Sequence, residues 1–341
     1  MKTSFFYANE ESELQVYLAS KNYQQIVCIA DAHTNGFCMP IVKKIFPFLQ
    51  TTTQIIIPEG EQNKNISTCI YVWHEMEKMQ LEKNTLLICV GGGTLSDLAG
   101  FVASTYKRGI DTMLIPTTLL SMVDACIGGK TAIDFSGNKN NIGTYHLPIA
   151  CYLNPIFLHT LPIRILQSGI GEMMKHALLC STDRWHTYRT LKIEDFYSIE
   201  KIRESLVFKN NIVEQDLHDL SLRQSLNFAH SIAHAIESYS LQGSTPLYHG
   251  EAVLLGIRHE LILSHIIFQL PQFIISDYEQ WLQQCFPELH FNYNLADIQS
   301  FLQQDKKNRD GYRMSLLKEI GVCETQVRVS EAQLQESFKL L

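Results

Sequence analysis

The chain has 341 residues, which is more than one hydrophobic core usually serves, so we expect two domains. Hydrophobic residues make up 45% of it and charged residues 18%, a mixture typical of folded globular proteins and not of disordered chains. The net charge of −7 excludes an extended nucleic-acid surface, which needs a basic excess, but it leaves room for a small anionic substrate bound by a few converging cations.

The cysteine pattern and the N-terminal segment indicate in which cellular compartment the protein is expected. The nine cysteines are scattered singly without a CxxC pair, which indicates neither a disulfide framework nor a thiolate zinc site. The opening segment MKTSFFYANE has no apolar signal-peptide core, and nowhere do about 18 uncharged apolar residues follow one another. We therefore expect a soluble, cytoplasmic protein without membrane or nucleic-acid partners.

The first half of the chain alternates short β-branched runs with segments of helical periodicity. One such segment, residues 66–80, repeats apolar side chains at helical spacing. This order predicts βαβ units, and hence an α/β nucleotide-binding domain with a parallel sheet over residues 1–160. The predicted strands, each ended by turn residues, are 24–31, 53–60, 85–93 and 111–118.

After about residue 160 strand-like runs become rare and helical periodicity dominates. The sequence therefore predicts a second, mainly α-helical domain over residues 161–341, expected to bind metal and substrate. The segments with helical periodicity are 164–182, 198–215, 226–240, 250–268 and 275–285.

Three consecutive glycines, Gly91 to Gly93, end the predicted strand TLLICV and precede a helix start at 95–104. Glycines in such a turn let the backbone approach a diphosphate, whose charge is favoured by free amides at a helix N-terminus. The cluster matches neither GxGxxG nor a Walker A loop. A turn that only lets strand and helix pack closely is an equally good interpretation.

A second cluster comprises Asp124, the run Gly128-Gly129-Lys130 and the pair Lys139-Asn140, on a stretch predicted to be rich in loops. Two lysines, an asparagine and glycines can hold a phosphate by charge-assisted hydrogen bonds. The alternative is a solvated loop. The apolar segment LIPTTLLSMV before the cluster favours the wall of a cleft.

The third cluster is rich in histidine. His230 and His234 stand four residues apart and share one face of a predicted helix, and His249 follows in a turn. Glu172 lies on an earlier predicted helix, three residues before Lys175. Imidazoles with one carboxylate can form an open zinc site, although a helical pair of histidines is by itself more often a surface or core feature. HSIAH lacks the glutamate of the HExxH motif, so a zincin protease is not indicated.

Together these clusters resemble the 3-dehydroquinate synthase family from about residue 53 to 325. The resemblance implies an enzyme that converts 3-deoxy-D-arabino-heptulosonate 7-phosphate to 3-dehydroquinate and phosphate, a step of the shikimate pathway to aromatic amino acids. The matching stretches, in the family's order, are PEGEQNK, GGGTLSDLAGF, ASTYKRGI, IPTTLLSMVDACIGGK, NKNNIG, FLHTLP, GEMMKH, SLRQSLNFAHSIAHAIE, HGEAVLLG and DKK.

The resemblance also implies roles for single residues, with NAD and one divalent metal ion, zinc or cobalt, as cofactors. Arg108 matches an arginine that reaches the phosphate from a neighbouring subunit, which implies a homodimer. The implied metal ligands are Glu172, His230 and His249. The positions matched to the NAD site are Glu61, Lys64, Gly92, Gly93, Asp97, Thr117, Thr118, Lys139, Phe157 and Thr160. The positions matched to the substrate pocket are Asp124, Lys130, Asn140, Lys175, Lys209, Arg223, Asn227, His234 and one of Lys306 or Lys307.

The implied reaction oxidises the substrate transiently at C5 with NAD, eliminates phosphate, reduces the product again and closes the ring by an intramolecular aldol step. The metal acidifies the substrate hydroxyl, and lysines around the phosphate stabilise the leaving charge. One bound NAD is thereby regenerated in each turnover. NADP is not expected, because no arginine follows the glycine turn where it would meet a 2′-phosphate.

Some positions depart from the family's pattern. Asp219 replaces a glutamate, and its shorter side chain is expected to displace a cationic partner. Ser96 and Ser221 replace glycines. Ala229 and Ala233 also replace glycines, and alanine inside a helix is expected to favour that helix by about 1 kcal/mol.

Other function classes compete with this interpretation. One is a cyclase acting on a sugar phosphate without a carboxylate, or a metal-dependent polyol dehydrogenase of similar fold. Another is a non-catalytic homologue, which the retained ligands and lysines disfavour. Arg223 with Lys209 suits a substrate carboxylate, because a guanidinium offers two parallel hydrogen bonds, whereas the alternative is that both are surface cations paired with Asp216 or Asp219.

Overall fold

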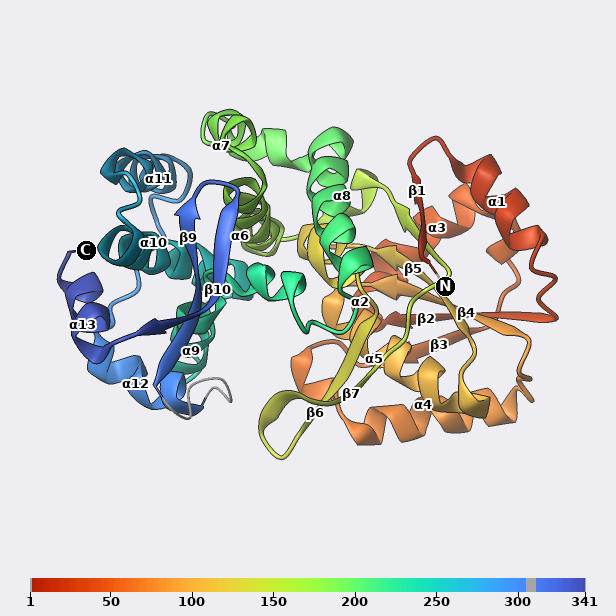
Figure 1. The fold of residues 1–341 in the computed structure, drawn as a ribbon. Helices are drawn as coiled ribbons and strands as arrows, with labels where there is room; N and C mark the ends of the chain where they lie inside the picture. The colour runs from red at the N-terminus through yellow and green to blue at the C-terminus, as the bar shows by residue number, and fades with distance from the viewer. Residues whose placement is uncertain (1, 305–310, 341) are drawn as a thin grey trace. The chain divides into compact units, whose positions relative to one another are not determined.

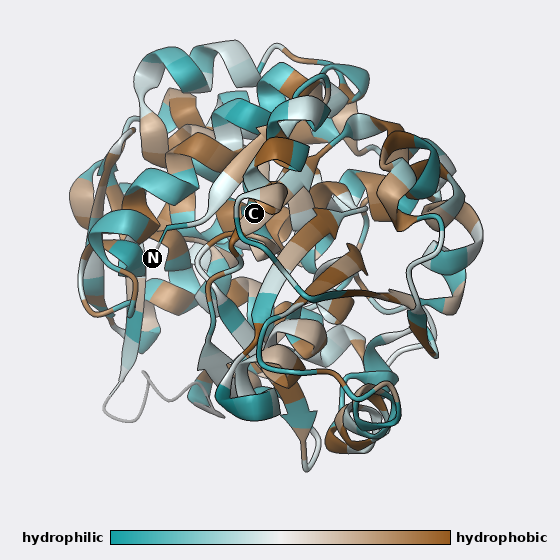
Figure 2. Cartoon of the chain, turned by 90° about the vertical axis from the view of Figure 1, so that its right-hand side faces the viewer, coloured by the Kyte–Doolittle hydropathy of each residue, from teal (hydrophilic) through white to brown (hydrophobic). Residues whose placement is uncertain are grey.

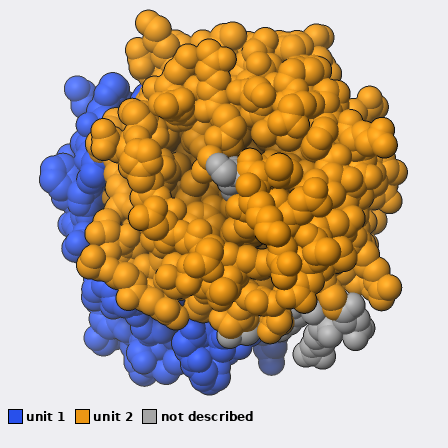
Figure 3. Space-filling model, turned by 90° about the vertical axis from the view of Figure 1, so that its left-hand side faces the viewer, with its two compact units in different colours: residues 1–162, 197–206 blue, residues 163–196, 207–341 orange. Residues whose placement is uncertain are grey.

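The computed structural model describes residues 2–304 and 311–340, which fold into two compact units (Figure 1). Unit 1 comprises Met1–Pro162 and Tyr197–Leu206, and unit 2 comprises Ile163–Phe196 and Val207–Leu341; Figure 3 colours them blue and orange. The predicted domains divide the chain after residue 160, whereas unit 1 continues to Pro162. The chain returns to unit 1 at Tyr197–Leu206, a stretch that the sequence prediction assigned to the second domain.

A six-stranded parallel sheet with the order β1-β8-β5-β4-β2-β3 forms the centre of unit 1. Its middle strand β4 is buried along its whole length, which is why its sequence is a continuous apolar run. The prediction of a parallel α/β sheet is confirmed. The strands are β1 (Ser4–Tyr7), β2 (Gln25–Asp31), β3 (Gln54–Ile57), β4 (Thr85–Gly91), β5 (Asp111–Pro116) and β8 (Ala150–Leu153).

The helices of unit 1 differ in burial: α5 is buried over most of its length, whereas α4 is amphipathic. In α4, Cys69, Val72 and Met76 recur at helical spacing and are buried, and the side chain of Asn65 caps the helix by accepting from the amide of Thr68. Figure 2 shows hydrophilic and hydrophobic residues alternating along the helices. The helices are α1 (Glu11–Ala19), α2 (Ala32–Phe37), α3 (Met39–Ile45), α4 (Ile66–Lys78) and α5 (Gly93–Thr105), with the short helical turns η1 (Pro47–Leu49), η2 (Glu61–Asn63), η3 (Tyr106–Arg108), η4 (Ser121–Ala125) and η5 (Pro155–Thr160).

The stretch predicted as loop-rich contains an antiparallel hairpin of β6 (Lys130–Phe135) and β7 (Asn138–Tyr145). Ser136 and Gly137 turn the chain with φ values of 52° and 77°, the left-handed conformation that tight hairpin turns need. Nearly every residue of β7 is exposed. The strand therefore lacks the apolar alternation by which sequence analysis detects strands, which explains the wrong prediction.

Unit 2 is mainly helical, as predicted. Its central helix α10 is buried on nearly all sides, and α8 begins in unit 1 and ends in unit 2. A hairpin of β9 (Tyr312–Glu319) and β10 (Val322–Val329), which was not predicted, covers a core that includes Leu263 and Leu316. The helices are α6 (Ile163–Cys180), α7 (Thr182–Tyr188), α8 (Ile199–Gln215), α9 (His230–Ser240), α10 (His249–Phe268), α11 (Gln272–Cys285), α12 (Leu295–Gln304) and α13 (Glu331–Lys339), with the turns η6 (Ile193–Tyr197) and η7 (Leu222–Asn227).

Across the described ranges, none of the helices combines the length and the apolar character needed to cross a membrane.

Candidate active site

The glycine turn lies at the carboxyl edge of the sheet of unit 1, where β4 and β5 end side by side. Gly91 pairs in register with Pro116, and the amide of Thr117 donates to the carbonyl of Gly91 at 3.0 Å. Gly92 is the N-cap of α5 and has no side chain to cap it. Amides of the first turn of α5 are therefore left for an anion such as a diphosphate.

The same turn has little room for side chains. A Cβ atom at Gly92 would lie 3.1 Å from Cγ2 of Thr118, and one at Gly93 would lie 3.2 Å from the Cβ of Ala125. Glycine keeps the backbone of the turn accessible at this crowded edge. The structure thus brings together four of the residues that sequence analysis assigned to one nucleotide site, at Gly92, Gly93, Thr117 and Thr118.

A buried lysine ties the β6–β7 hairpin to this edge of the sheet. Lys64 is 3% exposed, and its Nζ lies 2.7 Å from Oδ2 of Asp97 and 2.5 Å from Oδ1 of Asn140. The amide of Asn140 donates to Oδ1 of Asp134, whose own amide donates to the carbonyl of Lys64, both at 2.8 Å. Burial raises the pKa of Asp97 to about 6, although Lys64 opposes it. Lys64 and Asp97, expected at the NAD site, and Asn140, expected in the substrate pocket, thus meet in one network.

Arg108 lies in a strained turn. Lys107, Arg108 and Gly109 have consecutive positive φ values of 47°, 61° and 99°. The Nζ of Lys83 holds the turn by donating to the carbonyl of Arg108 at 3.2 Å and to that of Gly109. Such strain concentrates at functional positions, and the exposed Arg108 side chain makes this turn a candidate.

The other predicted residues of unit 1 have varied surroundings. Glu61 lies in η2, with Oε1 3.7 Å from the Nζ of Lys64. Phe157 in η5 is fully buried, whereas Thr160 at the end of η5 is partly exposed. The remaining three are the partly buried Asp124 in η4 and the exposed Lys130 and Lys139 in the hairpin.

In unit 2, three helices bring Glu172, His230 and His249 together. Oε1 of Glu172 lies 3.2 Å from Nε2 of His230 and 3.3 Å from Nε2 of His249. The three potential ligand atoms all lie within 4.8 Å of one another. Glu172 is fully buried, and its Oε1 makes no hydrogen bond with any described residue. A buried oxygen in this position requires a partner, and a cation suits it.

Close helix packing creates this centre. A Cβ atom at Gly250 would lie 1.6 Å from the carbonyl oxygen of Ser168, and one at Gly171 would lie 2.4 Å from the carbonyl oxygen of Gly250. Only glycine fits at these two positions of α10 and α6. Because Glu172 and His249 are the chain neighbours of these glycines, the close approach brings the carboxylate to the imidazole.

The second ring nitrogen of each histidine faces an acceptor. Nδ1 of His230 lies 3.1 Å from the carbonyl oxygen of Phe228, and Nδ1 of His249 lies 3.0 Å from Oε2 of Glu237. We assign a proton to each Nδ1, because both partners accept, and this leaves both Nε2 atoms to act as ligands. Two neutral imidazoles and one carboxylate fit zinc or cobalt with open positions for substrate and water.

The charges of the centre are consistent with metal binding. Burial raises the pKa of Glu172, but Lys175 and His230 outweigh it and hold that pKa well below its usual range. Burial, followed by Lys175, lowers the pKa of His230. Burial also lowers the pKa of His249, but its contacts with the carboxylates of Glu172 and Glu237 outweigh burial and raise the pKa to about 10. A metal ion bound at this centre would compete with a proton for His249.

Two further predicted residues border the metal centre. Nζ of Lys175 lies 2.5 Å from Oε2 of Glu172 and donates to the carbonyl of Leu226 at 2.9 Å. Lys175 thus engages the carboxylate oxygen that is not directed at His230 and His249; Nε2 of His176 lies 3.8 Å from the same oxygen. His234 is exposed, and its ring centroid lies 5.2 Å from that of His230 and 5.8 Å from that of His249.

Arg223 lies in η7 and is 4% exposed. The carboxylate of Asp216 accepts from the amides of Leu220, Ser221 and Arg223 at 3.0, 2.7 and 3.0 Å, while Nη1 of Arg223 donates to the carbonyl of Leu217 at 2.7 Å. Asp216 therefore organises the backbone of this loop and is no partner of the guanidinium. The alternative of a surface pair between Arg223 and Asp216 is wrong.

Three of the remaining residues considered in unit 2 lie near this loop in the sequence. Lys209 in α8 is buried, and Asn227 ends η7. Asp219 has a left-handed backbone with φ 60°. Lys306 and Lys307 lie outside the described residues.

The structure corrects the expectation for Ala229. This residue precedes α9 with φ 71° and ψ −19°, a left-handed conformation outside the helix, where a Cβ is unfavourable. The gain in helix propensity expected for alanine therefore applies only to Ala233 inside α9. Oε2 of Glu260 accepts from the amide of Ala229 at 2.6 Å. The carbonyl oxygen of Ala229 packs against Gly256, where a Cβ atom would lie only 2.3 Å from it.

The contacts of three acidic residues that support the site were not predicted: those of Glu237, of Glu260, and of Asp216, which was considered only as a partner of the surface cations. Glu237 had a detectable signal, because it lies three residues after His234 and so on nearly the same face of the helix. The contacts of Asp216 and Glu260 depend on a loop conformation and on helix packing, for which the sequence offered no such periodicity.

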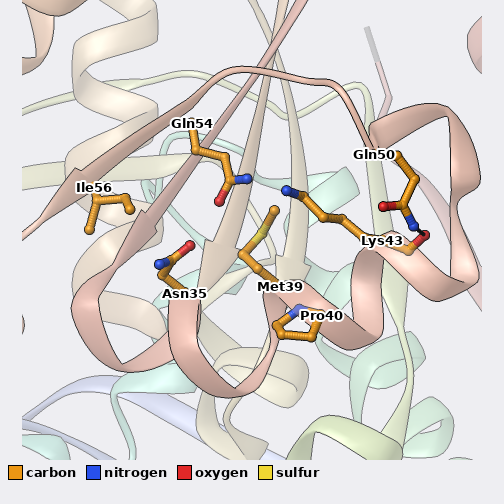
Figure 4. A pocket seen from close by; sticks show the side chains of 7 residues that line it. All are labelled: Asn35, Met39, Pro40, Lys43, Gln50, Gln54 and Ile56. Carbon is orange, nitrogen blue, oxygen red and sulfur yellow. Dashed lines mark hydrogen bonds between the residues drawn. The ribbon is translucent and has the colours of Figure 1, made fainter.

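A groove of about 640 Å³ in unit 1 lies apart from these residues (Figure 4). It runs beside α3 and the edge strand β3, and none of the predicted site residues lines it. Its lining consists of Asn35, Met39, Pro40, Lys43, Gln50, Gln54 and Ile56.

Two solved structures have the same fold as this chain. A 2-deoxy-scyllo-inosose synthase complexed with carbaglucose-6-phosphate, NAD+ and Co2+ aligns with a TM-score of 0.86 at 20% identity, over 98% of this chain and 96% of that chain. A 2-epi-5-epi-valiolone synthase from Streptomyces hygroscopicus subsp. jinggangensis with NAD+ and Zn2+ bound aligns with a TM-score of 0.84 at 22% identity, over 100% and 96%. The chain has the fold of these synthases.

Sequence comparison narrows this fold to one family. The family model described as 3-dehydroquinate synthase N-terminal matches residues 54–168, and the one described as 3-dehydroquinate synthase C-terminal matches residues 169–308. The 3-dehydroquinate synthase of Parabacteroides distasonis is 34% identical over 333 residues, which cover 96% of this chain and 94% of that protein. The chain belongs to the 3-dehydroquinate synthase family.

Proposed function

We propose that the chain is a 3-dehydroquinate synthase, a carbon–oxygen lyase that converts 3-deoxy-D-arabino-heptulosonate 7-phosphate to 3-dehydroquinate and inorganic phosphate. The observation that carries the proposal is the convergence of Glu172, His230 and His249 in a chain that matches this family along most of its length. The aromatic biosynthetic pathway and a cytoplasmic location are parts of the same proposal.

The cofactors of this proposal are NAD+ and a zinc or cobalt ion, which the residues of the two units suit. When bound, NAD+ accepts and returns a hydride, and the metal acidifies the substrate hydroxyl as a Lewis acid. The glycine turn and the start of α5 hold the diphosphate. Glu172, His230 and His249 hold the metal through one oxygen and two nitrogens.

Further residues bind the substrate and move protons. Arg223 binds the carboxylate: its Nη1 is held by Leu217, which leaves its other guanidinium nitrogens without partners among the described residues. Lys130 and Lys139 stabilise the charge of the leaving phosphate. The exposed His234, beside the metal centre, exchanges protons with the substrate.

The quaternary structure is part of the proposal. The exposed Arg108, in the turn held by Lys83, would complete the phosphate site of a second subunit in a homodimer. Its strained backbone supports a functional role for the turn.

The runner-up is a cyclase that acts on a sugar phosphate without a carboxylate. The fold alone does not distinguish it, because the two synthases of known structure described above align closely with this chain. The buried Arg223, in a loop organised by Asp216, favours a substrate that carries a carboxylate. Membership of the 3-dehydroquinate synthase family favours the same substrate. A polyol dehydrogenase has no use for this arginine or for the hairpin lysines.

Product analysis tests the proposal. Purified protein with the keto acid phosphate, NAD+ and Zn2+ should release inorganic phosphate and form 3-dehydroquinate in equal amount, without accumulating NADH. A chelator should stop the reaction, and added Zn2+ or Co2+ should restore it. NADH that accumulates in proportion to the substrate consumed would identify a dehydrogenase instead.

A further inference from the structure

We infer that Glu237 is a positioning residue of the metal centre, which sets the orientation and proton position of His249 and thereby the metal affinity of the chain. The inference rests on the proposed metal site and adds to it a residue outside the ligand set. Glu237 lies on α9, seven residues after His230, so α9 supplies one ligand and also the side chain that orients a ligand on α10.

The geometry selects one tautomer of His249. Its Nδ1 lies 3.0 Å from Oε2 of Glu237, and its Nε2 lies 3.3 Å from Oε1 of Glu172. A carboxylate can only accept at Nδ1, so the proton stays there and Nε2 is directed toward the metal position. Without Glu237 the neutral ring can carry its proton on Nε2 instead, and that tautomer cannot bind a metal through Nε2.

The two histidines differ in what orients them. Nδ1 of His230 faces the carbonyl oxygen of Phe228, a main-chain group that no side-chain substitution removes. His249 relies on the side chain of Glu237, and it is also the more exposed of the two ligands, at 26% against 16% for His230. The orientation of His249 is therefore the more sensitive one.

Charge supports the same role. The charge of Glu172 is already offset by Lys175, whose Nζ lies 2.5 Å from Oε2. The nearby Glu237, with a side chain 14% exposed, supplies a second negative charge to balance a divalent ion. A hydrogen-bonded carboxylate also raises the basicity of the imidazole that it contacts.

Metal titration of the metal-free protein tests the inference. We expect Glu237→Ala to weaken Co2+ and Zn2+ affinity by about 10- to 100-fold, the usual effect of removing the hydrogen-bond partner of a ligand histidine. Glu237→Gln should retain part of the affinity, because its amide oxygen can still accept from Nδ1. The absorption spectrum of bound Co2+ should change in Glu237→Ala, since the geometry of one ligand is altered.

Glu279→Gln is the matched control. Glu279 lies on α11 and pairs with Arg258 at 2.7 Å, so this variant makes the same change of charge in unit 2 without touching His230 or His249. It should bind Co2+ like the wild type. Glu237→Ala and Glu237→Gln with wild-type affinity and Co2+ spectrum would overturn the inference while leaving the proposed function intact. A wild-type protein that binds neither ion would overturn the metal centre and the inference with it.

Discussion

Ala229 has the backbone conformation on which the position of His230 depends. Its amide is held by Glu260 and its carbonyl packs against Gly256, so a left-handed conformation is imposed on a residue that carries a Cβ. The cost of that conformation for a non-glycine residue is about 1 to 2 kcal/mol. Glycine would avoid it at the expense of greater freedom in the unfolded chain.

We therefore predict that Ala229→Gly stabilises the protein by about 0.5 to 1 kcal/mol. The control is Ala233→Gly, inside α9, which should destabilise by about 1 kcal/mol. Urea unfolding midpoints of the two variants and the wild type check both signs. A lower midpoint for Ala229→Gly than for the wild type would contradict the proposed strain.

The lowered pKa of Asp216 predicts that the free energy of unfolding depends on pH. Hydrogen bonds from the backbone, the one from Leu220 above all, lower its pKa to about 2. The carboxyl group of Asp216 therefore binds its proton more tightly in the unfolded chain than in the folded protein. The stability that Asp216 contributes is complete above its ordinary pKa of about 4 and is lost as the pH falls toward 2.

Asp216→Asn should accordingly lose less stability than the wild type between pH 5 and pH 3. Melting temperatures at several pH values in this range, measured on both proteins, check the prediction. Parallel pH profiles would show that the loop before Arg223 does not depend on the charge of Asp216.

At the scale of elements, α9 presents two histidines with different functions. His230 at its first position faces Glu172, whereas His234 one turn later is exposed and lies outside the three-ligand group. We predict that His230→Ala abolishes stoichiometric Zn2+ binding, while His234→Ala keeps the metal and loses turnover. Metal analysis of the two purified variants checks this. Metal retained in His230→Ala and lost in His234→Ala would reverse the assignment.

Element length and burial explain how much of the fold was predictable. Long helices such as α10 and buried strands such as β4 have clear periodicity or continuous apolar runs. The strands β1 and β8 have only four residues each and lack β-branched residues, whereas the equally short β3 was predicted from its run of isoleucines. The exposed β7 has no apolar alternation to detect.

The candidate site was predictable where the type and position of a single residue indicate its chemistry. The resemblance to a family singled out Glu172, His230 and His249, and the structure brings these three residues together. It did not reveal the contact of Glu237 with His249 or the left-handed backbone at Ala229. Both depend on how α9 packs against α10, which propensity and periodicity do not encode.

At the scale of the whole molecule, the residues assigned to the proposed reaction come from both units. Unit 1 carries the glycine turn and the hairpin lysines, and unit 2 carries the metal centre and Arg223. The carboxylate of the substrate distinguishes the proposed reaction from those of the related cyclases. The central claim is therefore a claim about substrate preference.

The most direct test is the rate of inorganic phosphate release by the wild-type protein, with NAD+ and Zn2+, from 3-deoxy-D-arabino-heptulosonate 7-phosphate and from sedoheptulose 7-phosphate, which lacks the carboxylate. We predict a higher kcat/KM for the keto acid phosphate by at least about 100-fold, since a buried arginine left without its anionic partner costs about 3 kcal/mol or more. Faster phosphate release from sedoheptulose 7-phosphate would contradict the account and assign the protein to the other cyclases.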